Sequence, residues 1–251
     1  MQYLPDKNLF RFTIIGPETD IHDRLFYHSL FAMLQEAACL DADHNGFGAD
    51  VMDRIPACWL LLRMKVIMEK IPRWKDVIYV KTWSCGFEKV FFNRDFDILD
   101  ENLEVIGRAT SVWLVAHQGD HRPMRPSTIP GMEIYACRQP SDRHVEKIFP
   151  TSEEERRGVT KLTRYADYSE IDRNMHVNNT RYLAWSADAY YANVSHEEPI
   201  MELSINYSSE VHPGEEVHMY CIPKNGSMQV DGYEAGSGRH VFSTLIGRNI
   251  P

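Results

Sequence analysis

The 251-residue sequence has no apolar run long enough to cross a bilayer. A membrane-spanning helix needs about 20 mostly apolar residues, whereas the densest runs here, 58–62 and 112–116, are far shorter. The first residues have charges at Asp6, Lys7 and Arg11 and no apolar block, which is not typical of a secretion signal. We therefore expect a cytoplasmic protein that does not insert into a membrane.

The sequence also lacks paired cysteines. It has five, an odd number, with no C-x-x-C motif and no metal-ligand spacing, a pattern that indicates reduced, mostly buried thiols. His117 and His121 are four residues apart, but Gly119 lies between them after a predicted strand, which disfavours the helical face that a zinc pair needs. We expect neither a metal nor another cofactor.

Positive charge is scarce, with 27 Lys and Arg against 36 Asp and Glu and a net charge of −9. Nucleic acid is bound by clustered positive charge, so it is not an expected partner. Residues 117–164 have a slight excess of Lys and Arg, nine against seven Asp and Glu. This stretch is either an ordinary solvated linker or a contact surface for an acidic protein. The candidates for such a contact are Arg122, Arg125, Arg138 and Arg143.

The hydrophobic pattern predicts one long helix and several strands, and then repeats the plan. In the first half it predicts a strand at 11–15, a helix over 26–37 with Ser29 as N-cap, and strands at 58–68, 77–83, 90–99 and 104–116. In the second half it predicts a strand at 161–168, a helix starting near Asn179, and strands at 201–208, 215–221, 227–234 and 240–248. This is an α+β pattern.

Short matches support a duplication. Residues 23–24 match 172–173 at a separation of 149, and residues 74–77 lie over 214–217 at a separation of 140. On this alignment His176 faces a tyrosine and Glu210 faces a lysine. The sequence therefore predicts polar site chemistry in the second copy alone, and one active site per chain.

Asp172, Asn174 and His176 place a carboxylate, an amide and an imidazole within five residues. In an extended stretch alternate residues project to one side, so we expect the three side chains to lie together. A carboxylate that orients an imidazole, beside an amide, can polarise a carbonyl group. Turn and capping chemistry is the alternative reading of the same residues.

A predicted helix starts directly after this motif, with Asn178 or Asn179 as N-cap. The backbone N–H groups at a helix N-terminus favour a developing negative charge. We therefore expect an oxyanion donor among Val177, Asn178 and Asn179.

Together these residues resemble the acyl-acyl-carrier-protein (acyl-ACP) thioesterases of plants and bacteria, over nearly the whole chain. The similar stretches are 34–37, 46–48, 63–64, 72–77, 82–83, 109–113, 172–179 with Tyr182 and Trp185, and 207–210.

The resemblance implies two tandem hotdog folds, each a long helix wrapped by an antiparallel sheet, that pair within one chain. The expected division is an N-terminal hotdog over 1–128 that binds the acyl chain, a linker over 129–158, and a catalytic C-terminal hotdog over 159–251. The implied activity is hydrolysis of fatty acyl-ACP, with Asp172, Asn174, His176 and Glu210 as the catalytic set. Monomer and homodimer both stay open.

This sequence departs from the plant members directly after Glu210, where they have a cysteine and this chain has Val211. Valine has no nucleophilic atom, so an acyl-enzyme at that position is excluded. We expect direct attack by water, with Glu210 as general base, Asn174 and His176 holding the water or the carbonyl, and Asp172 fixing the imidazole. A general-base role for His176 stays open, as does a plain turn role for Glu210.

An acyl chain needs an apolar tunnel. The helix face expected to line it consists of Phe26, Leu30, Phe31, Met33 and Leu34, although such a face belongs to the core by default. Three other functions are compatible with the sequence: an acyl-CoA thioesterase, a hotdog dehydratase or hydratase, and a non-catalytic acyl-binding protein.

Overall fold

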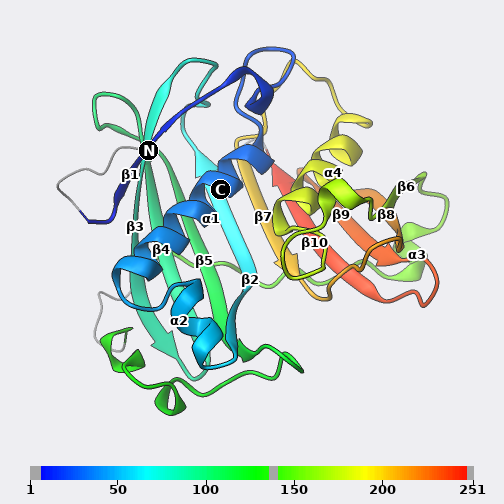
Figure 1. Cartoon of the computed structure of the whole chain (residues 1–251). Helices are drawn as coiled ribbons and strands as arrows, with labels where there is room; N and C mark the ends of the chain where they lie inside the picture. The colour runs from blue at the N-terminus through cyan, green and yellow to red at the C-terminus, as the bar shows by residue number, and fades with distance from the viewer. Residues whose placement is uncertain (1–6, 136–140, 248–251) are drawn as a thin grey trace. The chain divides into compact units, whose positions relative to one another are not determined.

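The computed structural model describes residues 7–135 and 141–247, which fold as two compact units (Figure 1). Unit 1 comprises Met1–Phe26 and Leu30–Val145, and unit 2 comprises Tyr27–Ser29 and Glu146–Pro251. The boundary after Val145 lies inside the stretch 129–158 that we expect to be a linker. None of the described helices has the length and apolar content needed to span a bilayer.

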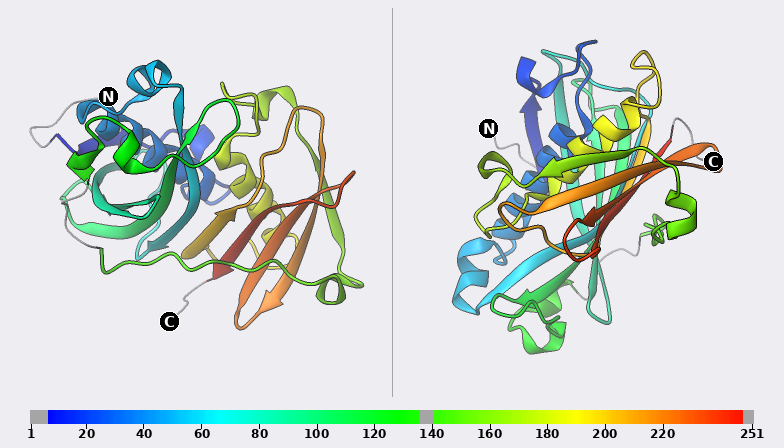
Figure 2. Two further views of the ribbon diagram at one scale, coloured as in Figure 1. Left: turned by 90° about the horizontal axis from the view of Figure 1, so that it is seen from below. Right: turned by 90° about the vertical axis from the view of Figure 1, so that its right-hand side faces the viewer.

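Unit 1 consists of a long helix, α1, packed on an antiparallel sheet with strand order β1-β3-β4-β5-β2. Its elements are β1 (Leu9–Thr13), η1 (Gly16–Glu18), α1 (Tyr27–His44), α2 (Ala49–Arg54), β2 (Ala57–Met68), β3 (Val77–Glu88), β4 (Phe91–Leu99), β5 (Val105–His117), η2 (Pro126–Thr128) and η3 (Met132–Tyr135). Figure 2 shows the strands of this unit bending around α1.

Unit 2 repeats the arrangement around a shorter helix, α4, with strand order β7-β10-β9-β8-β6, all neighbours antiparallel. Its elements are α3 (Glu153–Arg156), β6 (Lys161–Tyr165), η4 (Tyr168–Glu170), α4 (Asn179–Tyr191), β7 (Glu202–Tyr207), β8 (Glu216–Lys224), β9 (Ser227–Glu234) and β10 (His240–Gly247).

The two long helices are held by the apolar faces that the sequence pattern predicts. Leu34 and Ala37 of α1 are fully buried, as are Leu183 and Ala189 of α4. Burying such side chains stabilises the fold by about 25 cal/mol for each Å² of apolar surface removed from water. The helix–sheet layers therefore form the core of each unit.

The predicted elements are confirmed, with a few differences at their ends. Ser29 lies inside α1 and is not its N-cap, because the helix starts with the bond from the Leu30 N–H to the carbonyl of Phe26. Strand β3 runs five residues past its predicted end because a bulge at Gly86, whose φ is +94°, keeps it paired with β4. Helix α2 was not predicted, since six residues show too little periodicity.

The duplication is visible in matching backbone hydrogen bonds. In unit 1 the Asp20 N–H donates to the Arg24 carbonyl at 2.8 Å, and in unit 2 the Asp172 N–H donates to the His176 carbonyl at 2.9 Å. The equivalent positions are therefore 152 apart, so the separation of 149 inferred from the sequence is wrong. This error of three residues changes which residue of unit 1 corresponds to each residue of the turn in unit 2.

The correction changes what unit 1 contains. His176 corresponds to Arg24, and Asp172 corresponds to Asp20, whose carboxylate pairs with the Arg24 guanidinium at 2.8 Å. The alignment that set His176 against a tyrosine is therefore wrong, whereas the restriction of the site chemistry to unit 2 stays a prediction. Unit 1 has an ion pair where unit 2 has the candidate catalytic motif.

The next loop is also repeated, with a separation of 139. The Leu25 N–H donates to the Pro72 carbonyl and the Val177 N–H donates to the Val211 carbonyl, both at 2.9 Å. Glu210 therefore corresponds to Ile71 and not to the neighbouring lysine of the sequence alignment. The carboxylate of this position is specific to unit 2.

Gly214 and Lys75 occupy the same place in these loops, with φ of +81° and +76°. Left-handed backbone is unfavourable by about 1 kcal/mol for a residue with a Cβ, and a Cβ at Gly214 meets no atom within 4 Å. We expect Gly214→Ala to lower the free energy of unfolding by about 1 kcal/mol through backbone conformation alone. Chemical denaturation measures this change.

Lys75→Gly is the matched variant. It removes the backbone strain that Gly214→Ala introduces, and it also makes the unfolded chain more flexible. These effects nearly cancel, so stability should change by less than about 0.5 kcal/mol. Equal destabilisation by the two substitutions would contradict the structural equivalence of these positions.

Candidate functional site

The motif that starts at Asp172 is a tight turn. Its N–H groups close it, with Met175 donating to the carbonyl of Asp172 at 3.0 Å and Asp172 donating to the carbonyl of His176 at 2.9 Å. Met175 has a φ of +64°. The expected extended stretch with three side chains on one side is therefore wrong, because the backbone bonds fold residues 172–176 back on themselves.

Within this turn, Asp172 and Asn174 have local contacts. One oxygen of the Asp172 carboxylate accepts the Asn174 N–H at 2.8 Å, which makes a side-chain-closed turn. The Asn174 side chain is exposed. The turn thus ties Asp172 to His176 through the backbone, so the capping alternative explains part of what Asp172 does.

The central contact of the site joins two loops. His176 Nε2 lies 3.2 Å from Oε2 of Glu210, which lies in the loop after β7. The His176 side chain is 18% exposed and that of Glu210 36%, so the pair is partly shielded and still open to solvent. An imidazole and a carboxylate at this distance can share and transfer a proton.

The loop after β7 is fixed by residues that the sequence interpretation missed. Arg239, in the turn between β9 and β10, donates through Nη1 to the Glu210 carbonyl, and its Nη2 lies 3.1 Å from the Glu215 carboxylate. That carboxylate also accepts the His212 N–H at 2.9 Å. Arg239 is distant in the sequence from Glu210, so no local pattern indicates this contact.

A second imidazole lies beside His176. The ring of His212 is 4.9 Å from that of His176 between centroids, with an angle of 63° between the ring planes. Tyr182 of α4 borders the same loop, and burial raises the pKa of its hydroxyl, against the opposite effect of a hydrogen bond from the Val211 backbone. The Tyr182 hydroxyl therefore stays protonated.

The start of α4 offers fewer oxyanion donors than the sequence suggests. The N–H of Val177 donates to the carbonyl of Val211 at 2.9 Å, and that of Asn178 donates to the carbonyl of Glu170 at 2.8 Å. These two backbone groups are occupied, so assigning them to an oxyanion is wrong. Asn179, in the first turn of the helix, is the remaining candidate.

Asn178 instead caps the helix. Its side-chain oxygen accepts the backbone N–H of Thr180 at 3.0 Å and the hydroxyl of the same residue at 2.7 Å. The N-cap predicted at Asn178 or Asn179 is thus confirmed at Asn178.

The structure offers no thiol at the position next to Glu210. Val211 is fully buried there. Burial raises the pKa of Cys221, in β8, to about 11, which keeps this thiol protonated and poorly nucleophilic. Over residues 7–135 and 141–247, no three His, Cys, Asp or Glu side chains gather as a metal site.

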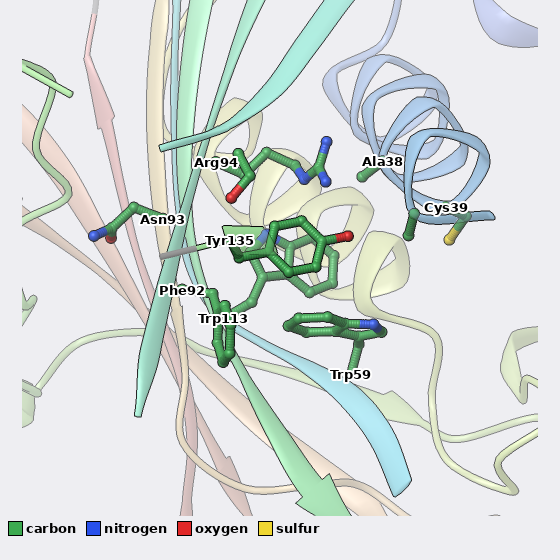
Figure 3. Close-up of a pocket in the computed structure, with 10 residues that line it drawn as sticks. Ala38, Cys39, Trp59, Phe92, Asn93, Arg94, Trp113 and Tyr135 are labelled. Atoms are coloured by element: carbon green, nitrogen blue, oxygen red, sulfur yellow. The ribbon is translucent and has the colours of Figure 1, made fainter. Parts of the chain in front are cut away.

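The expected acyl-binding face belongs to the core. Leu30, Phe31, Met33 and Leu34 are all buried, and Phe26 is half-buried just before α1. Unit 1 instead has a cavity further along α1, with about 460 Å³ of empty space including its open mouth (Figure 3). It is lined by Ala38, Cys39, Ala42, Trp59, Ser84, Phe92, Asn93, Arg94, Trp113 and Tyr135.

The four candidate arginines for a partner contact have different environments. Arg143 has its charge compensated within unit 1, with Nη2 2.8 Å from the Asp97 carboxylate and Nη1 donating to a backbone carbonyl, which makes it a weaker candidate for a partner contact. Arg138 lies outside the described residues. Arg122 and Arg125 are exposed, and Arg122 lies 3.2 Å from Asp120.

Two family models match the chain. The acyl-ACP thioesterase N-terminal domain matches residues 7–129, and the acyl-ACP thioesterase C-terminal domain matches residues 154–240. Together they include every strand of both units except β10, of which only the first residue, His240, is matched.

Curated relatives agree with these models. The chain is 26% identical over 217 residues to oleoyl-acyl carrier protein thioesterase 2, chloroplastic, of Arabidopsis thaliana, covering 80% of this chain and 58% of the relative. It is 30% identical over 179 residues to the palmitoyl-acyl carrier protein thioesterase, chloroplastic, of the same plant, covering 66% and 42%. The chain thus spans less than two thirds of the length of these relatives.

Solved structures share the fold. An acyl-ACP thioesterase from Bacteroides thetaiotaomicron superposes with a TM-score of 0.83 at 23% identity, covering 95% of this chain and 96% of that one. The 12:0-ACP thioesterase from Umbellularia californica gives 0.82 at 19% identity, covering 98% of both. The predicted tandem hotdog architecture is confirmed, and the chain belongs to the acyl-ACP thioesterase family.

Proposed function

We propose that this protein hydrolyses fatty acyl-ACP to free fatty acid and carrier protein by direct attack of water on the thioester. The observation that supports this most is the contact of 3.2 Å between His176 and Glu210, next to a buried valine. The names of the relatives agree with acyl-ACP as substrate. A thioester suits such a site, because its carbonyl is weakly resonance-stabilised and its thiolate leaves readily.

The geometry favours Glu210 over His176 as the general base. Nε2, the outer nitrogen of the His176 ring, faces the carboxylate, so the inner nitrogen close to the backbone would have to reach the water if histidine were the base. The Glu210 side chain is twice as exposed as that of His176. Glu210 thus removes a proton from water, and His176 orients the carboxylate and stabilises the charge that develops.

The tetrahedral intermediate needs donors for its oxyanion. The first turn of α4 supplies the positive end of a helix dipole, and its Asn179 N–H is the donor in our proposal. The exposed Asn174 side chain is the second candidate for holding the carbonyl or the water. Asp172 acts through the turn, because its backbone N–H fixes the His176 carbonyl at 2.9 Å.

We expect Glu210→Gln to lower kcat by about a hundredfold or more while leaving the fold intact, because the amide cannot accept the proton. Thiol release from acyl-ACP measures the rate. Thiol release without an enoyl product also separates hydrolysis from dehydration, and retention of the acyl group without turnover would indicate a binding protein.

Glu216→Gln is a matched control. Glu216 pairs with Nε2 of His218 at 2.7 Å in β8, and the two side chains have nearly the same exposure as the candidate pair. This variant should retain full activity. If Glu210→Gln were as active as the control, the general-base role would be wrong.

Arg239 is expected to be a positioning residue, since it binds the Glu210 carbonyl and Glu215 at once. Arg239→Met should lower kcat roughly ten- to hundredfold, because a displaced base loses alignment with the water. KM should change little, and Arg239→Lys should restore part of kcat.

Arg164→Met is the control for this experiment, because Arg164 forms a surface ion pair with Asp188 at 2.7 Å and is about equally exposed. A purely structural role for Arg239 would lower thermal stability in proportion to activity. An unchanged kcat in Arg239→Met would exclude the positioning role.

Carrier-protein binding is proposed to use the exposed Arg122 and Arg125, because an acidic partner is attracted by positive charge. The double variant Arg122→Glu, Arg125→Glu should raise KM for acyl-ACP severalfold and barely change turnover of a small acyl thioester. Arg108→Glu, a charge reversal at an exposed ion pair with Glu69, is the control. The control changes the net charge by half as much, so a KM increase in the control about half that of the double variant on a logarithmic scale would show that only net charge matters.

A further inference from the structure

The cavity of unit 1 has mostly apolar walls, three neutral polar residues (Ser84, Asn93 and Tyr135) and one charged group. Ala38 and Ala42 leave room along α1, and the rings of Trp59, Trp113 and Tyr135 line the opposite side. Among these rings lies Arg94 of β4, whose guanidinium extends toward α1 in Figure 3. A hydrocarbon site needs no such group.

The tryptophans contribute only apolar surface to this cavity. The indole N–H of Trp59 donates to the Phe47 carbonyl at 3.1 Å, and that of Trp113 donates to the Ser111 hydroxyl at 2.7 Å. Both N–H groups are therefore satisfied by the protein. Arg94 is then the charged donor that a ligand in the cavity would meet, beside the hydroxyl of Tyr135.

Arg94 is buried, and some of its N–H groups have no acceptor among the described residues. Its Nη1 lies 2.8 Å from the Asp41 carboxylate and donates to the Thr82 hydroxyl at 3.1 Å. Within the part of the chain that the structure describes, these contacts all use Nη1. A guanidinium has five N–H groups in a planar fork, so the N–H groups of Nε and Nη2 remain available to a ligand. The Arg94 side chain is 9% exposed.

The net charge of the Arg94–Asp41 pair determines which kind of ligand group can accept a hydrogen bond from Arg94. Asp41, with a side chain that is 6% exposed, already balances the positive charge of Arg94. A carboxylate in the cavity would add an uncompensated negative charge in a poorly hydrated place. An unsubstituted alkyl chain would displace water from the remaining N–H groups and leave them without acceptors. A neutral oxygen avoids both penalties.

We propose that the unit 1 cavity binds an acyl chain bearing a hydroxyl or keto oxygen, which accepts a hydrogen bond from Arg94. This inference rests on the proposed function for the acyl-thioester substrate and specifies its class. A site built to bind a substrate oxygen discriminates strongly against the analogue that lacks it, since its own polar groups are then left unpaired.

Direct binding tests the proposal without requiring turnover. Trp59 and Trp113 line the cavity, so their fluorescence reports occupancy. The probes are decanoic acid amide and its hydroxy and keto derivatives, with the oxygen near the amide, in mid-chain or at the methyl end. At least one oxygenated probe should bind about tenfold or more tightly than the plain chain. Equal affinities for all probes would overturn the proposal.

The double variant Arg94→Met, Asp41→Asn removes the guanidinium and its partner together, so that no buried charge stays unpaired. It should lose the preference for oxygen and bind the plain chain at least as well as the wild type. Arg164→Met, Asp188→Asn, a surface pair of unit 2, is the control and should keep the preference. A preference that survives in the Arg94 double variant would overturn the proposal.

A second variant keeps the test valid if the first fails to fold. Ala38→Leu fills the cavity from α1 and should weaken binding of every probe, whereas unchanged binding would place the probes elsewhere. Hydrolysis of hydroxyacyl- and acyl-ACP of equal length is then compared as kcat/KM. Selective binding with no hydrolysis of either substrate would refute the proposed function and leave the cavity assignment standing.

Discussion

The candidate site depends on one backbone hydrogen bond, from the N–H of Val177 to the carbonyl of Val211. It joins the turn before α4 to the loop after β7, and so places His176 opposite Glu210. Unit 1 has the same bond between Leu25 and Pro72 at the same length. Because this bond uses only main-chain atoms, side chains at the neighbouring positions can differ between the units without loss of the scaffold. His176 and Glu210 therefore lie on a backbone framework that both units share, at positions where unit 1 has other residues.

What the two units place on this framework differs in kind. In unit 1 the Asp20 carboxylate pairs with Arg24 at 2.8 Å, so the charge is compensated inside the turn. In unit 2 a histidine replaces the arginine, and its partner is Glu210 in the other loop, where unit 1 has an isoleucine. An arginine stays charged at all physiological pH values, whereas an imidazole can gain and lose a proton. At the position of His176, unit 1 therefore has a group that stays protonated and cannot act as a base.

The Arg94–Asp41 ion pair is unusual in the lining of a largely apolar cavity. Charged side chains are seldom buried, and when they are buried they need a partner. Arg94 and Asp41 compensate each other's charge between β4 and α1, and this pairing allows a guanidinium to remain where hydrocarbon would otherwise pack. The two units thus place their polar groups differently. The candidate pair of unit 2, His176 and Glu210, is partly exposed in loops, whereas the Arg94–Asp41 pair of unit 1 is buried beside α1.

The sequence by itself determined the elements and the chemistry at single positions. Periodicity predicted the helix and strands of each unit, because apolar faces must be buried at fixed spacing, and Val211 excluded a thiol nucleophile because a side chain's atoms are known from its identity. Only the tertiary structure decided which groups meet. The tight turn at Asp172, the occupied N–H groups of Val177 and Asn178, and the Arg239 contact all depend on backbone bonds between distant segments. The register of the repeat was wrong by three residues for the same reason, since hydrogen bonds fix equivalence and short sequence matches do not.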